Sequence, residues 1–123
     1  SQVAQLIDIM PTLLDFCGAE IPASVQGRAL GPILRGEAEA LVENSAFIET
    51  HAGAIGLRTP THLYGMQLEE DLRTISDEGQ CFYDLAADPY EQQNLAGHTE
   101  STLEIELAQR LTEWNAQTPW LED

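Results

Sequence analysis

The 123-residue chain has the length of a single domain and is strongly acidic. It carries 21 Asp and Glu residues against 5 arginines and no lysine, a formal net charge of -16, which argues against binding to nucleic acid or to an anionic membrane surface. Its 43% hydrophobic content excludes a disordered chain, and no apolar run approaches the ~18 residues that a membrane span needs. We interpret the acidity as a solubilising surface, with an acidic patch for a cationic partner as the alternative.

The two cysteines, Cys17 and Cys81, are too few for a disulfide scaffold. Each lies in an apolar run, which predicts two buried small hydrophobes, and one bridge between them is the alternative. The cysteines therefore leave the cellular compartment open.

Apolar residues recur at helical spacing from Val3 to Cys17, but Pro11 is unsuited to a helix interior. An N-cap at Asp8 would place Pro11 in the first turn, where amide hydrogens are unpaired. The spacing therefore predicts a helix over 9–17 that ends at Gly18. A loop over 21–36 follows, with one helical turn at 30–34, and then an acidic linker or weak helix over 37–43.

Four segments have the composition of strands, at 46–50, 54–59, 61–68 and 80–85. Their short links predict an antiparallel meander, with a polar hairpin connection over 69–79. After the fourth strand, Asp88 and Pro89 predict a hard turn, and Glu91 is expected in a single helical turn.

The last helix is the clearest element of the chain. Ser101 and Glu104 have the spacing of a capping box, and an apolar stripe follows at Leu103, Leu107, Ala108, Leu111 and Trp114. These elements predict an α+β fold in which a four-stranded antiparallel sheet packs against the C-terminal helix. We divide the chain into a helix and loop over 1–44 and a sheet-plus-helix subdomain over 45–123.

Three stretches of this sequence resemble sulfatases. Residues 82–95, FYDLAADPYEQQNL, resemble the signature LYDL-x-x-DP-x-E-x-x-NL near the sulfatase C-terminus. Residues 8–36 resemble D-x-x-PTLL-D-x-AG … IP … QGRSL-x-P-L-L-x-G, with Cys17 and Ala29 at the usual Ala and Ser. Residues 57–65 resemble V-R-T-x-x-x-K-Y-I, although Leu63 and Gly65 stand at the usual Lys and Ile.

The resemblance implies a sulfate ester hydrolase that uses a formylglycine, made from the Cys or Ser of C/S-x-P-S-R, beside a divalent cation that is usually calcium. Neither Cys17 nor Cys81 is followed by that motif. We therefore expect no catalytic residue, metal ligand or cofactor in this chain, and place the formylglycine and the calcium in an N-terminal sulfatase domain outside it. The chain would complete the fold and shape the substrate cleft without catalysing alone.

The resemblance also implies that the predicted helix over 9–17 belongs to the interface with that large domain. Its apolar face, made by Met10, Leu13, Leu14 and Cys17, would be uncovered in the isolated chain. We expect the isolated chain to self-associate through this face, as a two-fold dimer, and the alternative is that the segment folds back onto its own sheet.

Two residues are candidates for the substrate cleft. His51 lies at a strand-to-turn corner, and the alternative is an exposed loop histidine. Arg58 is predicted to brace the sheet by pairing with Asp84 or Glu91, and a substrate-facing role is the alternative. The acidic residues around 69–78 are interpreted as a solvated hairpin tip, and the three scattered histidines do not have the spacing of a zinc site.

Two other functions remain open from the sequence. One is a free-standing module that dimerises or docks through an apolar helix face. The other keeps the superfamily but changes the substrate to a phosphonate or phosphate ester. An upstream C/S-x-P-S-R motif in the same reading frame would separate the enzyme from the docking module.

Overall fold

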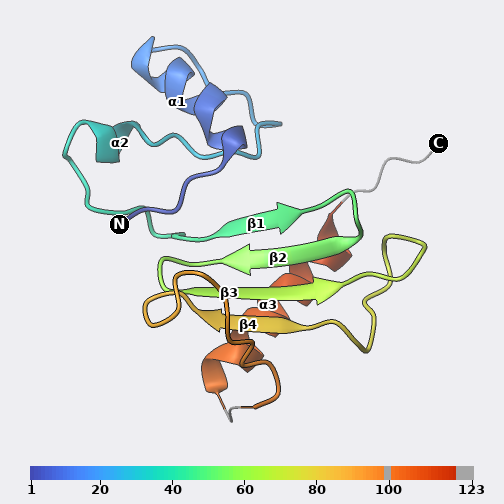
Figure 1. Cartoon of the computed structure of the whole chain (residues 1–123). Coiled ribbons are helices and arrows are strands. Elements are labelled where there is room, and N and C mark those ends of the chain that lie inside the picture. Colours follow the sequence, from blue (N-terminus) through green and yellow to red (C-terminus); the bar gives the residue numbers. More distant parts are fainter. Residues whose placement is uncertain (99–100, 119–123) are drawn as a thin grey trace. The chain divides into compact units, whose positions relative to one another are not determined.

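The computed structural model describes residues 1–98 and 101–118, and the chain divides into two compact units, Ser1–Ala46 and Phe47–Asp123. The first unit holds a 3-10 helix, η1 (Leu6–Asp8), and two helices, α1 (Ile9–Phe16) and α2 (Gly31–Leu34). The second holds a four-stranded sheet and the helix α3 (Thr102–Gln117), as Figure 1 shows.

Helix α1 confirms the predicted helix to within one residue. It ends in a Schellman motif, because Gly18 N–H donates to Asp15 O, Ala19 N–H donates to Leu14 O, and Gly18 has a φ of 66°. Asp8 holds the predicted N-cap position, which places Pro11 in the first turn of α1, but its side chain makes no capping hydrogen bond there. That carboxylate is instead wholly buried and accepts from Gln5 N–H and from Arg28.

The sheet is the predicted antiparallel meander. Its strands are β1 (Ala46–Glu49), β2 (Ala54–Arg58), β3 (His62–Gln67) and β4 (Cys81–Asp84), in the order β1-β2-β3-β4. Gly56 lies opposite Gly65, which in turn lies opposite Cys81, and Tyr64 lies opposite both Leu57 and Phe82. Side chains alternate between the two faces, so this register decides which residues share a face.

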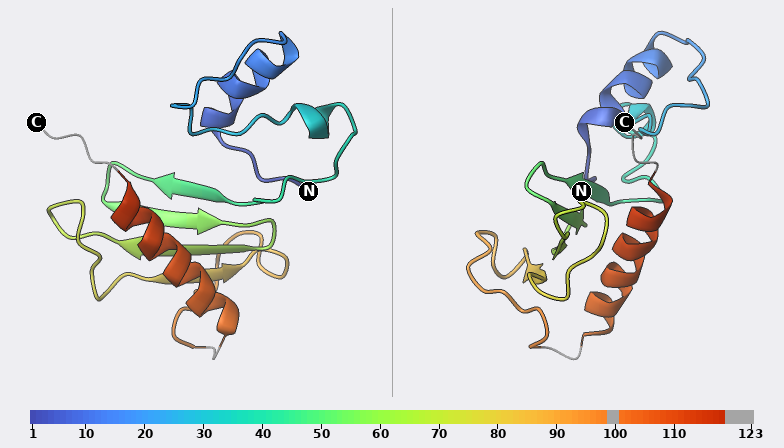
Figure 2. Two further views of the ribbon diagram at one scale, coloured as in Figure 1. Left: turned by 180° about the vertical axis from the view of Figure 1, so that it is seen from behind. Right: turned by 90° about the vertical axis from the view of Figure 1, so that its right-hand side faces the viewer.

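Helix α3 covers one face of this sheet (Figure 2). Leu107 and Leu111 of α3 are fully buried against alternate residues of the strands, namely Ile55, Leu57, Tyr64, Met66 and Phe82. At one side of this core the rings of Phe47 and Trp114 stack, with their centroids 5.0 Å apart. The structure confirms the α+β fold and the apolar stripe of the last helix.

One half of the predicted capping box, the bond to Ser101, is present at the N-terminal end of α3, whereas the Glu104 carboxylate binds Gly97. Ser101 Oγ accepts a hydrogen bond from Glu104 N–H, and the Glu104 carboxylate accepts from Gly97 N–H. Within residues 1–98 and 101–118, no helix is both long and apolar enough to cross a membrane.

Candidate functional site

Residues of the sulfatase-like stretch over 8–36 form a buried polar cluster around Asp8. Asp8 Oδ1 accepts from Arg28 N–H at 2.8 Å, and Oδ2 accepts from Gln5 N–H at 2.9 Å and from Arg28 Nη2 at 3.1 Å. Burial by itself raises the pKa of Asp8, but the donated hydrogen bonds and the Arg28 charge lower it below its usual value on balance. The cluster fastens the loop at Arg28 to the start of α1.

Thr12 and Gly27 complete the same cluster. Thr12 Oγ1 donates to Asp8 O at 2.6 Å and accepts from Leu30 N–H at 2.9 Å. A Cβ at Gly27 would lie 1.9 Å from the Ile7 carbonyl oxygen, so only glycine allows the loop to approach η1 this closely. The types of these four residues, Asp8, Thr12, Gly27 and Arg28, thus follow from the way the loop packs on η1 and α1.

The end of the sulfatase-like stretch over 82–95 covers the outer edge of β4. Asn94 Oδ1 accepts from Phe82 N–H at 3.0 Å, Asn94 Nδ2 donates to Gln80 O at 3.1 Å, and Leu95 N–H donates to Phe82 O at 2.8 Å. These contacts satisfy backbone groups that an edge strand would otherwise present to other chains. The predicted helical turn at Glu91 is wrong, because Glu91 has a φ of 55° and Asp88 closes a turn by accepting from Gln93 N–H.

Asn94→Ala is expected to lower the stability of the sheet unit by about 1–2 kcal/mol, because Phe82 N–H and Gln80 O lose their partner. Gln92→Ala is the matched control, since the Gln92 amide bonds only the neighbouring Tyr90 O on the surface. Urea unfolding monitored by circular dichroism compares the two variants. Equal midpoints for Asn94→Ala and Gln92→Ala would show that Asn94 does not hold the edge.

His51 is exposed in the turn between β1 and β2, and that turn is tightly held. Gln67 Nε2 donates to both Ala52 O, at 3.2 Å, and Gly53 O, at 2.9 Å. Leu72, whose φ of 56° lies in the left-handed region, packs over Gly53. The sequence gives no signal for this Gln67 and Leu72 support, because it depends on contacts between separate hairpins.

Arg58 is half-buried at the end of β2, and its predicted brace is wrong. Within the described residues no carboxylate lies within ion-pair distance of its guanidinium, and Asp84 Oδ1 accepts from Ala86 and Ala87 N–H. Arg58 lies in register with Leu63, and Leu63 with Tyr83. His51 precedes β2 and Arg58 ends it, so the structure places the two candidates at opposite ends of one strand.

No group of three or more His, Cys, Asp or Glu residues in the described ranges has a geometry that suits a metal ion. In the acidic hairpin, hydrogen bonds from Thr74 and Arg73 lower the pKa of Asp71 to about 2, and Asp71 closes its own loop with them. Of the histidines, His51 and His98 are exposed, and His62 stacks on Phe82.

Both cysteines are free, and the prediction that Cys17 is buried is wrong. Cys17 is exposed at the end of α1, whereas Cys81 is half-buried on the sheet. Burial, and then the nearby charge of Glu91, raises the pKa of the Cys81 thiol. Cys81 therefore lacks the lowered pKa of an activated thiol nucleophile.

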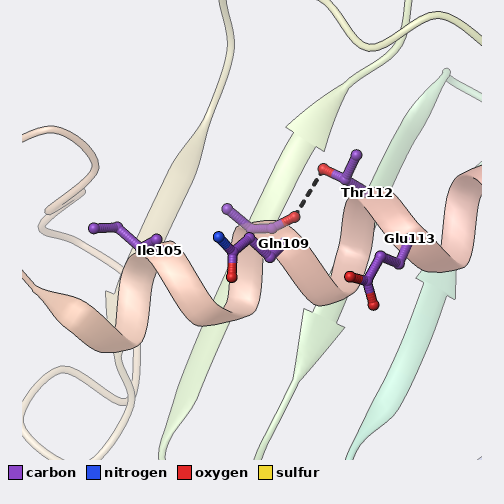
Figure 3. A pocket seen from close by; sticks show the side chains of 5 residues that line it. Ile105, Gln109, Thr112 and Glu113 are labelled. Carbon is purple, nitrogen blue, oxygen red and sulfur yellow. Dashed lines mark hydrogen bonds between the residues drawn. The ribbon is translucent and has the colours of Figure 1, made fainter.

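The outer side of α3 carries a shallow hollow, lined by Ile105, Ala108, Gln109, Thr112 and Glu113 (Figure 3). Its one internal hydrogen bond runs from Thr112 Oγ1 to Ala108 O at 2.8 Å. Only Glu113 among the lining residues is charged, so the hollow holds no set of groups that converge on a ligand.

Solved sulfatase structures of the alkaline-phosphatase-like superfamily contain a matching subdomain, a four-stranded antiparallel sheet packed against a C-terminal helix. A family profile described as "N-sulphoglucosamine sulphohydrolase, C-terminal" matches residues 1–117, and the chain belongs to that family.

Among curated relatives, the chain is 31% identical to an N-acetylglucosamine-6-O-sulfatase of Bacteroides thetaiotaomicron, over 95% of this chain and 22% of that protein. A solved structure in complex with its substrate, D-glucosamine-2-N,6-O-disulfate, matches with a TM-score of 0.71 and 28% identity, over 89% of this chain and 23% of the other. The phosphonate monoester hydrolase of Agrobacterium radiobacter shares the fold at a TM-score of 0.68 and 22% identity, over 95% and 26% of the two chains. The chain thus spans about a quarter or less of the proteins to which it is similar.

Proposed function

We propose that this chain is the C-terminal subdomain of a longer sulfatase polypeptide that hydrolyses sulfate esters. Its role is to complete the fold and to shape the substrate cleft, while the formylglycine and the calcium ion belong to the large N-terminal domain. The family match over residues 1–117 carries the proposal, because the same relatives are about four times as long as this chain.

We propose a sulfated amino sugar as the substrate class. The relative at 31% identity acts on a 6-O-sulfated N-acetylglucosamine, and the solved neighbour holds a sulfated glucosamine. The alternative substrate is a phosphonate or phosphate ester, favoured by the phosphonate monoester hydrolase that shares the fold. Initial rates of the full-length polypeptide on matched 4-nitrophenyl sulfate and phenylphosphonate esters separate the two.

The exposed side of α1 supports the presence of a large partner domain. Of the predicted face, Leu14 is half-buried, but Met10, Leu13 and Cys17 are exposed, although monomers rarely leave such apolar patches uncovered. In the full-length enzyme we assign this face to the contact with the large domain. In the isolated chain the same face would pair two copies.

Arg58 is the residue of this chain that we expect to bind the anionic substrate. Its guanidinium is half-buried and has no carboxylate within ion-pair distance in the described part of the chain, so it is available to an anion from outside. His51, on its supported turn, is the second candidate and would contact a different part of the substrate, because β2 separates the two positions.

In the full-length enzyme, Arg58→Ala is expected to raise KM for the sulfated sugar about 10- to 100-fold with kcat nearly unchanged. That change corresponds to loss of a charge-assisted hydrogen bond worth about 1.5–3 kcal/mol in both ground and transition states. Steady-state kinetics and the melting temperature are measured together.

Arg35→Ala is the matched control, because Asp15 and Glu37 already satisfy the Arg35 guanidinium. It is expected to leave KM unchanged. If Arg58→Ala lowers the melting temperature and leaves KM as it was, Arg58 is a structural residue and does not face the substrate.

A further inference from the structure

A buried asparagine of α3 is only partly hydrogen-bonded. Asn115 is 8% exposed, and its Nδ2 donates to Arg73 O at 2.9 Å. Within the described residues, its Oδ1 has no hydrogen-bond partner. A buried amide oxygen without a partner lowers stability, whereas an apolar side chain of the same shape would not. Stability therefore does not account for an asparagine at this position, and its bond to Arg73 O indicates a role in placing the loop over 69–74.

This loop is closed by its own hydrogen bonds. Asp71 Oδ1 accepts from Arg73 N–H at 2.9 Å and from Thr74 N–H at 2.8 Å. Leu72 stands directly before Arg73 and has a φ of 56°, a left-handed conformation that leucine rarely adopts. The loop and its bond to α3 thus hold the Leu72 side chain in one direction.

The Leu72 side chain contacts the turn that carries His51. A Cβ added to Gly53 would lie only 3.1 Å from Leu72 Cδ2, and Gly53 has a φ of 75°, so this turn needs glycine for both space and conformation. His51 lies in the same turn and is exposed. A series of contacts therefore connects Asn115, through the loop, to His51.

Two features along this series of contacts lower stability. Leu72 has a left-handed backbone, and Asn115 Oδ1 is unpaired in the part of the chain that the structure describes. Strained and unsatisfied groups concentrate at functional sites, where the geometry they maintain is needed. At the end of the series, the imidazole of His51 can donate a hydrogen bond to a sulfate or to a sugar hydroxyl.

We propose that Asn115 and Leu72 are positioning residues, which hold His51 in the orientation in which it binds the sulfated substrate. This inference rests on the proposed function, in which His51 is the second substrate-binding candidate. Both residues act through the turn at Gly53 and do not touch the substrate themselves.

A double-mutant cycle in the full-length polypeptide tests this, with His51→Ala, Asn115→Leu and the two combined. Leucine has nearly the shape of asparagine but cannot donate to Arg73 O, and Arg73 is exposed, so water can bond that carbonyl instead. Asn115→Leu is expected to keep the melting temperature or to raise it. Hydrogen exchange of residues 50–54 is expected to accelerate in this variant.

Kinetics are measured on whichever of N-acetylglucosamine 6-sulfate and 4-nitrophenyl sulfate is turned over faster. His51→Ala is expected to raise KM about tenfold, and Asn115→Leu to raise it about threefold to tenfold, with kcat nearly unchanged in both. When His51→Ala is already present, adding Asn115→Leu is expected to leave KM as it is, because the two residues act as one unit.

An equal rise of KM with and without His51→Ala would overturn the proposal, because Asn115 would then act on something other than His51. An unchanged KM in either single variant would overturn it as well, while turnover of a sulfate ester by the same samples would leave the proposed function standing. If the unsubstituted full-length polypeptide hydrolyses no sulfate ester, the proposed function fails and this inference fails with it.

Gln109→Leu is the matched control, because Gln109 is an exposed amide on the outer side of the same helix (Figure 3). It is expected to change neither KM nor the exchange of residues 50–54. Leu72→Gly is the second variant, which decides the matter if Asn115→Leu lowers the melting temperature. Glycine adopts a φ of 56° without strain but has no side chain over Gly53, so KM is expected to rise as in Asn115→Leu. An unchanged KM in Leu72→Gly would contradict the positioning role.

Discussion

Replacing Arg28 with alanine is expected to destabilise the Ser1–Ala46 unit by about 3–5 kcal/mol. The Asp8 side chain is completely buried, and Arg28 is its partner in the ion pair. Without the guanidinium, the carboxylate stays buried with only the backbone N–H groups of Gln5 and Arg28. Amide hydrogen exchange across α1 measures the loss, because opening of this unit exposes those amides.

Arg35→Ala is the control for Arg28→Ala, since the Arg35 pair with Asp15 is about one-third exposed on each side. Exposed ion pairs contribute about 0.2–1 kcal/mol to stability, so amide hydrogen exchange in α1 is expected to change little in Arg35→Ala. Equal acceleration of exchange in the two variants would show that the Asp8 cluster does not hold the unit together.

The Asp8 cluster also predicts how the stability of the Ser1–Ala46 unit changes with pH. The folded pKa of Asp8 lies below its unfolded value of about 3.9, so its stabilising contribution is fully present above that value. It is lost as the pH falls through the folded pKa. Arg28→Ala, which removes the main charge partner, is therefore expected to reduce the acid sensitivity of α1 exchange along with its stability.

Periodicity predicted the regular elements well, because each buries a face of its own. The strand alternation located all four strands within two residues at each end, and the stripe around Leu107 and Leu111 located α3. Composition could not predict the details at Asp8 or Glu91. The hydrogen-bond partners of Asp8 lie in other segments, such as the loop at Arg28. At Glu91 the backbone makes a left-handed turn that the residue types do not require.

For the candidate site, the sequence predicted candidate residues but not the contacts that these residues make. Arg58 and His51 stay predictions as substrate-cleft residues, and the brace predicted for Arg58 is wrong, because Asp84 uses an oxygen to close its own turn. The family-like motifs proved to be structural: Asp8, Thr12 and Arg28 fasten a loop, and Asn94 covers an edge. The third stretch, over 57–65, contains Arg58, the residue that we propose binds the substrate.

We expect this chain to be needed for sulfatase activity but not to catalyse by itself. Release of sulfate from N-acetylglucosamine 6-sulfate and from 4-nitrophenyl sulfate should be measured for three polypeptides: the full-length protein, this chain alone, and the full-length protein without these 123 residues. We predict turnover by the full-length protein alone, because the chain has no formylglycine motif and the remainder lacks its docking partner. Turnover by the isolated chain above a buffer blank, or undiminished activity of the shortened protein, would show that this chain is not a non-catalytic subdomain that the enzyme requires.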